Sequence, residues 1–285
     1  MGILGIRIQT KNGLPIYTET WSEKLEGFES ADQMLQAGFM TAILSFAKNL
    51  KNKVGFIRFL PEQDEDSEHL HQSYGIDAMI SLRKEIIFIL FLEPYIFKKH
   101  IELKIDWIYE MIVKNYENQI EKGERIEFTN QEEKLIENIL FDSLGRKFIN
   151  KRRKKIEKKI NKLLIKKFSH ENIRGIAICS FDNSILFSYL IDEKELQIYL
   201  NNMGLITKIK EWDTQYKPIW LTNKSPILVS VVNSAMKVPI IPDIDKSKLR
   251  IPYFYYLISD QDASLGPLTE KLLFTLNHFF LEDNE

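Results

Sequence analysis

The fold of this chain is decided by a short stretch near its start, GIRIQT at residues 5–10, and by its recurrence as GIAICS at residues 175–180. In both stretches isoleucines alternate with other residues, a pattern that favours a strand with one buried face. Each stretch is followed by a turn sequence, Asn12-Gly13 in the first and Asp182-Asn183 in the second, and then by a returning apolar stretch. Both places therefore predict a β-hairpin, and the constant spacing of 170 residues indicates an internal duplication.

The residues that follow the first hairpin predict a complete α+β domain over residues 1–120. A core-facing helix is expected over residues 31–50, because apolar residues recur there at intervals of three or four. A polar, acidic surface loop is expected over residues 61–73. The remaining elements are strands at 53–60, 76–82 and 85–92, and a long helix after Pro94. The order is β-β-α-β-β-β-α.

The second hairpin opens the same order of elements, and we assign residues 169–285 to a second domain. Strands are expected at 173–180, 185–191, 218–222, 226–233 and 253–259, and helices at 193–203 and 265–280. The predicted fold class is therefore α+β, with two five-stranded antiparallel sheets and flanking helices.

A long basic helical linker is expected over residues 121–168, between the two domains. Thr129 and Glu132 form a capping-box pattern, and the helical periodicity then runs to Phe168 as one long helix or two consecutive ones. Gly145 is the place where this helix is expected to bend or break. Residues 146–167 contain twelve basic residues and one acid, Glu157, which gives the segment a charge of +11.

The net charge of the whole chain is only −1, because the basic segment is offset by −12 elsewhere. An anionic partner is therefore not excluded. The hydrophobic content of 44% excludes a wholly disordered chain, and the single cysteine, Cys179, excludes an intrachain disulfide. The most apolar run, residues 86–92, is too short to span a bilayer as a helix. We expect a cytoplasmic protein, and peripheral attachment to a membrane is left open.

The order of elements resembles that of the longin and roadblock families, which share a profilin-like architecture. Residues 5–8, the hairpin through Gly13, the helix at 31–50 and the strand at 54–59 carry the likeness to a longin domain. In the second domain, residues 175–178 and the turn at 262–266 resemble a roadblock or second longin unit, with Ser264 in place of the usual asparagine. The whole chain resembles the two-domain longin-like proteins of eukaryote-related archaea.

This resemblance implies a non-enzymatic scaffold or regulator of a small GTPase or a trafficking-like complex. The implied partners are a small GTPase or another longin or roadblock protein, with homodimerisation or pairing of the two domains as further alternatives. Whether such a protein would activate the GTPase, exchange its nucleotide or hold it passively stays open.

No motif in the sequence predicts catalysis or a cofactor. The chain has no phosphate-binding Gly-x-x-x-x-Gly-Lys-Ser/Thr loop, no Gly-x-Gly-x-x-Gly and no Gly-x-Ser-x-Gly elbow. Cys179 is interpreted as a small core residue in a buried strand. His69 and His71 are interpreted as part of a solvated acidic loop, and residues 260–262 as a turn or helix cap. We expect no catalytic, cofactor or metal site.

The basic helix is the one feature that predicts binding through its charge. Three interpretations stay open: a solvated face beside an apolar seam, docking on an anionic membrane or acidic partner, and nucleic-acid binding. The last is the least favoured, because lysine reads bases less specifically than arginine does. A peripheral membrane or nucleic-acid binding protein acting through residues 146–167 is thus the alternative function. The candidate residues are Lys151, Arg152, Arg153, Lys154, Lys155, Lys158, Lys159 and Lys162.

Overall fold

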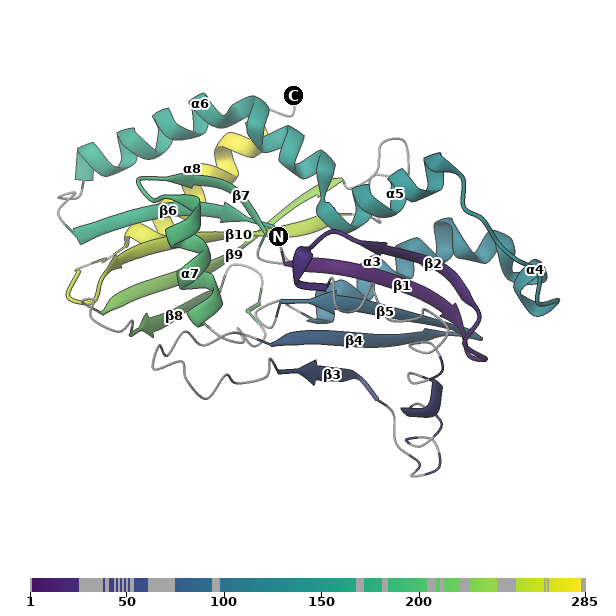
Figure 1. The fold of residues 1–285 in the computed structure, drawn as a ribbon. Helices are drawn as coiled ribbons and strands as arrows, with labels where there is room; N and C mark the ends of the chain where they lie inside the picture. The colour runs from purple at the N-terminus through teal and green to yellow at the C-terminus, as the bar shows by residue number, and fades with distance from the viewer. Residues whose placement is uncertain are drawn as a thin grey trace. The chain divides into compact units, whose positions relative to one another are not determined.

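The structure is a computed structural model of the 285-residue chain, and it is α+β (Figure 1). It describes residues 2–25, a few positions between 38 and 51, and then 54–60, 75–93, 98–167, 172–180, 184–203, 209–210, 213–220, 226–239, 250–263, 265 and 267–282. The chain divides into two compact units, residues 1–140 and 141–285. The helix expected over residues 31–50 and the acidic loop expected over 61–73 lie largely or wholly outside the described residues.

Unit 1 contains a five-stranded antiparallel sheet, as the sequence predicted. Its strands run in the spatial order β2-β1-β5-β4-β3. The sheet begins with the expected hairpin, in which Gly13 takes the positive φ of 85° that its turn requires. The strands are β1 (Ile3–Thr10), β2 (Pro15–Thr20), β3 (Phe56–Phe59), β4 (Ile76–Arg83) and β5 (Ile86–Leu92). Further elements of unit 1 are η1 (Glu23–Leu25), α3 (Lys98–Met111), η2 (Val113–Tyr116), α4 (Glu117–Glu121) and α5 (Asn130–Phe141).

Unit 2 contains a second five-stranded antiparallel sheet with the corresponding order β7-β6-β10-β9-β8. Strand β8 begins four residues before the start expected at Pro218, because β8 is an outer strand, where proline is tolerated. The strands are β6 (Ile173–Cys179), β7 (Ile185–Tyr189), β8 (Thr214–Ile219), β9 (Ile227–Pro239) and β10 (Arg250–Asp260). The helices are α6 (Ser143–Lys167), α7 (Glu193–Met203) and α8 (Leu268–Glu282).

The pairing registers of the two sheets repeat as well as their strand orders. Ile8 lies opposite Tyr17, and Ile178 lies opposite Phe187, so both partners are displaced by 170 residues. The pairing shifts by one residue immediately after Ile8 and immediately after Ile178. A β-bulge is a specific feature of the backbone, and its recurrence at the same place supports a duplicated unit.

Helices cover both faces of the second sheet. The hydroxyl of Tyr216 on β8 lies 3.4 Å from that of Thr269 on α8, and the next side chain, Lys217, donates to the carbonyl of Met203 on α7 at 2.7 Å. Successive side chains of a strand point to opposite faces, so α7 and α8 lie on opposite sides of the sheet. Helix α6 shares one buried apolar cluster with α8 and therefore covers the same face as α8 (Figure 1).

The basic helix is part of unit 2, which differs from the expected linker over residues 121–168 between domains 1–120 and 169–285. The reason is its apolar seam, because Ile149, Ile156, Ile160 and Leu164 are fully buried and pack in the core of unit 2. Apolar residues that recur every four or seven positions form one stripe along a helix, and such a stripe packs against a sheet rather than facing solvent.

Candidate functional site

The start of helix α6 is fixed by Asp142, which separates α5 from α6. Asp142 is fully buried and has a φ of 50°, a left-handed conformation that aspartate tolerates better than most residues. One of its carboxylate oxygens accepts from the amide of Gly145 at 3.1 Å, and the other accepts from the Ser180 hydroxyl at 3.1 Å. The helical segment is thus two consecutive helices, and the break lies at Asp142 rather than at Gly145.

Gly145 has a packing role within α6 instead of breaking it. A Cβ atom at this position would lie 1.9 Å from the Tyr253 hydroxyl and 2.5 Å from the Asp142 carboxylate. Only glycine lets the first turn of α6 approach β10 this closely. The cap and this contact set the direction in which the rest of the basic helix runs.

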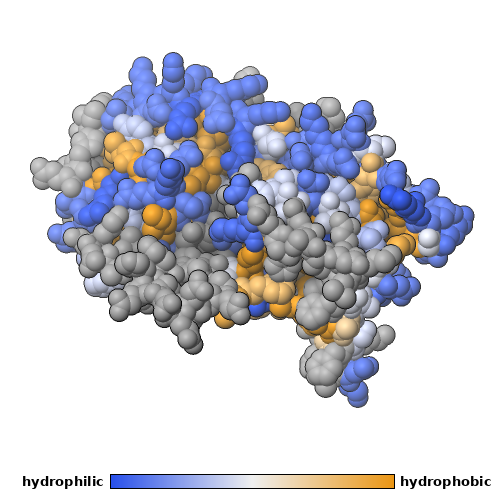
Figure 2. Space-filling view, viewed as in Figure 1, coloured by the Kyte–Doolittle hydropathy of each residue, from blue (hydrophilic) through white to orange (hydrophobic). Residues whose placement is uncertain are grey.

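Six of the eight predicted binding residues form an exposed lysine row on α6. The exposed members are Lys151, Lys154, Lys155, Lys158, Lys159 and Lys162, and Lys147 extends the row by one turn. At 100° per residue these lysines occupy an arc of about 140° on the side opposite the buried seam. At 1.5 Å per residue the row is about 22 Å long. Figure 2 shows hydrophilic side chains along this helix.

The other two predicted residues, Arg152 and Arg153, have contacts within unit 2. The guanidinium of Arg152 lies 3.9 Å from the centre of the Phe148 ring, a cation–π contact. Arg153 pairs with Glu157 at 3.3 Å and donates to the carbonyl of Ser188 at 3.4 Å. Both residues are half-buried; the contact of Arg152 lies within α6, whereas Arg153 links α6 to β7, and we leave both out of the candidate interface.

Arginines of α6 also cover the outer strand of the second sheet. Arg146 donates to the carbonyl of Ile185 at 3.0 Å, and Arg153 donates to that of Ser188, so both contact the backbone of β7. An outer strand otherwise presents unpaired carbonyls that can recruit another strand. The sequence grouped these arginines with the lysines because both are positively charged. Their contacts show instead that the arginines bind the backbone of β7.

The sequence pattern did not single out a buried lysine in unit 1. Lys104 on α3 is fully buried, and its ammonium donates to the carbonyl of Leu140 at the end of α5. The signal was present in the spacing, because Lys104 lies between Ile101 and Ile108 on the buried side of α3. This contact ties α3 to the end of α5 and does not point to a ligand.

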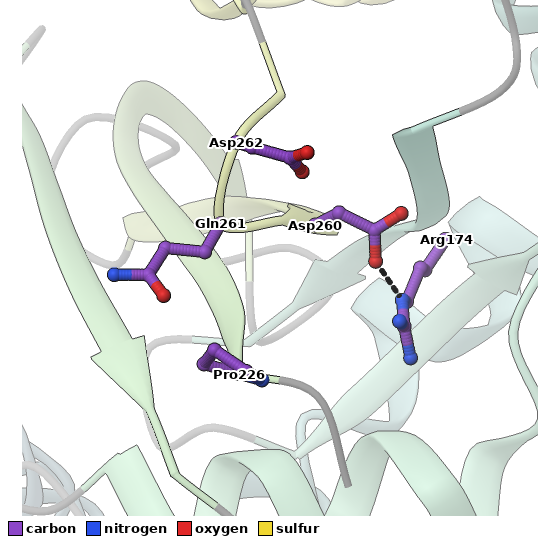
Figure 3. A pocket seen from close by; sticks show the side chains of 5 residues that line it. All are labelled: Arg174, Pro226, Asp260, Gln261 and Asp262. Atoms are coloured by element: carbon purple, nitrogen blue, oxygen red, sulfur yellow. Dashed lines mark hydrogen bonds and ion pairs between the residues drawn. The ribbon is translucent and has the colours of Figure 1, made fainter.

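The turn after β10 lines a surface pocket of about 480 Å³. Arg174, Pro226 and residues 260–262 form its wall (Figure 3). Asp260 pairs with Arg174 at 2.5 Å, and its carbonyl accepts from the amide of Ala263 at 3.2 Å, as the predicted turn requires. Pairing with Arg174 makes Asp260 a poor candidate for a metal ligand.

Within the part of the chain that the structure describes, no three His, Cys, Asp or Glu side chains are grouped to hold a metal. His69 and His71 lie outside that part. Cys179 is fully buried in β6, as expected. Among the described helices, none is both long enough and apolar enough to cross a bilayer.

A comparison of the chain with protein-family models gives no match, and a comparison with curated proteins gives no significant one.

Proposed function

We propose that the chain is a non-enzymatic protein-interaction module, built from two longin- or roadblock-like units, that acts as a scaffold or regulator of a small GTPase or trafficking-like complex. The two repeated sheets support a duplicated unit, and the profilin-like assignment rests on the shared order of elements. The choice of a small GTPase as partner comes from the family resemblance.

The observation that carries the proposal is an outer strand with exposed apolar side chains that occurs once in each unit. In β3, Phe56 is 52% exposed, and Leu60 just after the strand is 74% exposed. In β8, Tyr216 is 52% exposed, and Trp220 just after the strand is 69% exposed. Large apolar side chains on an outer strand are typical of a surface that adds a strand or helix from a partner.

The two outer strands correspond through their pairing registers. Phe56 lies opposite Met79, and Tyr216 lies opposite Ser230. Met79 pairs with Leu90, which in turn pairs with Ile6. Ser230 pairs with Leu257, which in turn pairs with Ile176. Because Ile6 and Ile176 correspond, Met79 and Ser230 are equivalent positions. The same kind of surface is therefore present twice, which supports a role in binding.

The test is a binding assay of the full chain against small GTPases from the same organism, in their GDP and GTP-analogue forms. The double variants Phe56→Ser/Leu60→Ser and Tyr216→Ser/Trp220→Ser should each weaken binding at least tenfold, because a buried aromatic contributes about 2 kcal/mol. Leu103→Ser and Ile198→Ser remove exposed apolar side chains from helices and serve as matched controls.

Absence of binding at tens of micromolar in either nucleotide state would count against the small GTPase. Self-association that is lost in the edge variants would instead support homodimerisation. Equal binding by the edge variants and the controls would contradict the use of β3 and β8.

A further inference from the structure

The outward side of the α6 and α8 layer combines two features that the proposed function does not use. Both helices pack on one face of the second sheet, so their opposite sides face away from it. The side of α6 that faces away carries the lysine row. On α8, Leu272, Leu276 and Phe279 are buried, whereas Phe274 is 71% exposed.

The lysine row and Phe274 lie on neighbouring helices of the same layer. The ammonium of Lys159 is 5.9 Å from the centre of the Phe279 ring, which places the edge of the row against α8. Phe274 is five residues before Phe279 and on the opposite side of α8, beside the exposed His278 at 5.9 Å between ring centres. The lysine row and Phe274 thus both lie on the sides of α6 and α8 that face away from the sheet.

The charge of this surface is strongly one-sided along α6. The row contains seven exposed lysines, and the only acid of residues 146–167 is Glu157, which is half-buried and pairs with Arg153. An exposed acid, Glu270, lies one turn before Phe274 on α8. The positive charge of the row thus complements an anionic partner. The negative charge of Glu270 weakens this attraction near Phe274.

We propose that the outward surface of α6 and α8 docks on an anionic lipid membrane, with the lysine row against the headgroups and Phe274 inserted into the interface. A polybasic row alone gives weak attachment, and an added apolar anchor supplies the second contact that stable attachment needs. This proposal is independent of the small GTPase.

The arrangement favours a membrane over a nucleic acid. The row is straight and presents lysines only, because Arg152 and Arg153 contact Phe148, Glu157 and β7. Lysine attracts phosphate as a point charge but does not read bases in the bidentate manner of arginine. Phe148 lies beneath Arg152 and is half-buried, so this ring is not offered to bases for stacking.

The experiment is sedimentation of the full chain with vesicles of phosphatidylcholine, with and without phosphatidylserine, at several salt concentrations. The wild type should bind the anionic vesicles only, and less strongly as salt rises. A variant with glutamine at Lys151, Lys154, Lys158 and Lys162 should lose two to three orders of magnitude in affinity, at about fivefold for each lysine.

A matched control has glutamine at four exposed lysines outside the row, namely Lys51, Lys122, Lys194 and Lys210. It changes the net charge equally and should lose less than about threefold, because these lysines do not lie on α6. Equal losses in the two quadruple variants would overturn the proposal, since the attraction would then depend on total charge.

The apolar contact is tested separately. Phe274→Ser should weaken vesicle binding about tenfold without changing its salt dependence, whereas Ile198→Ser on α7 should have no effect. Glu270→Gln should strengthen binding slightly. Tighter binding to single-stranded RNA than to anionic vesicles at equal phosphate concentration, or equal binding to neutral vesicles, would overturn the membrane assignment.

Discussion

The strands β1 and β6 hold the same place in their sheets but have different side chains on one face. Ile6 and Ile8 correspond to Ile176 and Ile178, and all four are fully buried. On the other face, Arg7 corresponds to Ala177, and Gln9 corresponds to Cys179. Unit 1 thus buries a cation and an amide where unit 2 buries two small residues.

The difference shows which part of the pattern the fold needs. The isoleucine face and the bulge recur, and they fix the register. The side chains on the opposite face differ between the two units, and those of unit 1 reduce its stability. Burial lowers the pKa of Arg7, and within the described structure the side-chain amide of Gln9 has no hydrogen-bond partner. A buried amide of this kind costs about 1–3 kcal/mol.

The largest effect is expected when unit 2 receives the residue of unit 1. Ala177→Arg should destabilise unit 2 by more than about 4 kcal/mol, because the site has neither room nor an arranged partner for a guanidinium. Hydrogen exchange of β6 and β10, read separately from that of β1 and β5, measures the loss in one unit.

Thr18→Arg, at an exposed position of the outer strand β2, is the control and should change stability by less than about 0.5 kcal/mol. Normal protection of β6 in the Ala177→Arg variant would mean that this face of unit 2 accommodates a cation as readily as unit 1 does.

The glycines at the start of the two strands should differ in their tolerance of a methyl group. A Cβ at Gly175 would lie 2.5 Å from the branched Ile191 side chain, whereas a Cβ at Gly5 would meet the flexible end of Leu25 at 2.9 Å. Gly175→Ala should therefore cost about 3 kcal/mol and Gly5→Ala about 1 kcal/mol. Unit-resolved hydrogen exchange of the two variants checks the order, and a reversed order would contradict the packing argument.

Removing the unpaired amide should stabilise unit 1. Gln9→Met keeps the shape of the side chain and should raise the free energy of unfolding by about 1 kcal/mol. Cys179→Met at the corresponding position should lower it by about 2 kcal/mol, because it adds volume to a filled site. Urea unfolding measures both changes, and destabilisation by Gln9→Met would reveal a partner for the amide.

The smallest effect concerns pH. Burial, followed by the charges of Glu19, Glu133 and Glu137, raises the pKa of Tyr17, whose counterpart in unit 2 is Phe187. The unfolded chain releases this proton near pH 10 while the folded unit retains it, so stability falls as pH rises above 10. Tyr17→Phe should reduce the loss between pH 8 and pH 11 by about 1 kcal/mol in urea unfolding. Identical losses in the two proteins would exclude this contribution.

Most of the described sheet architecture could be predicted from the sequence, because alternation and turn residues act locally. The expected strand at residues 173–180 and helix at 193–203 agree with β6 and α7 to within one residue. The break between α5 and α6 could not be placed, because the left-handed conformation of Asp142 is stabilised by Ser180 from a distant strand. The sequence predicted the break at Gly145 instead, because glycine has a low preference for helices.

The candidate site could be predicted in part. The seven lysines of the row on α6 are exposed, as a helix with one apolar seam requires. The roles of Arg146 and Arg153 depend on β7, which lies more than thirty residues further along the chain, so no local pattern reveals them. The same holds for Lys104, whose partner is the end of another helix.

Arg146 and Arg153 of α6, which contact β7, also limit how the second sheet can grow. Because two carbonyls of the outer strand β7 already accept from guanidinium groups, this edge is less suited to the addition of another strand. A sheet that accepts strands at both edges can extend into a filament, whereas one that accepts a strand at a single edge stops after one pairing. The contacts that hold α6 in place therefore also act against growth of this sheet from its β7 edge.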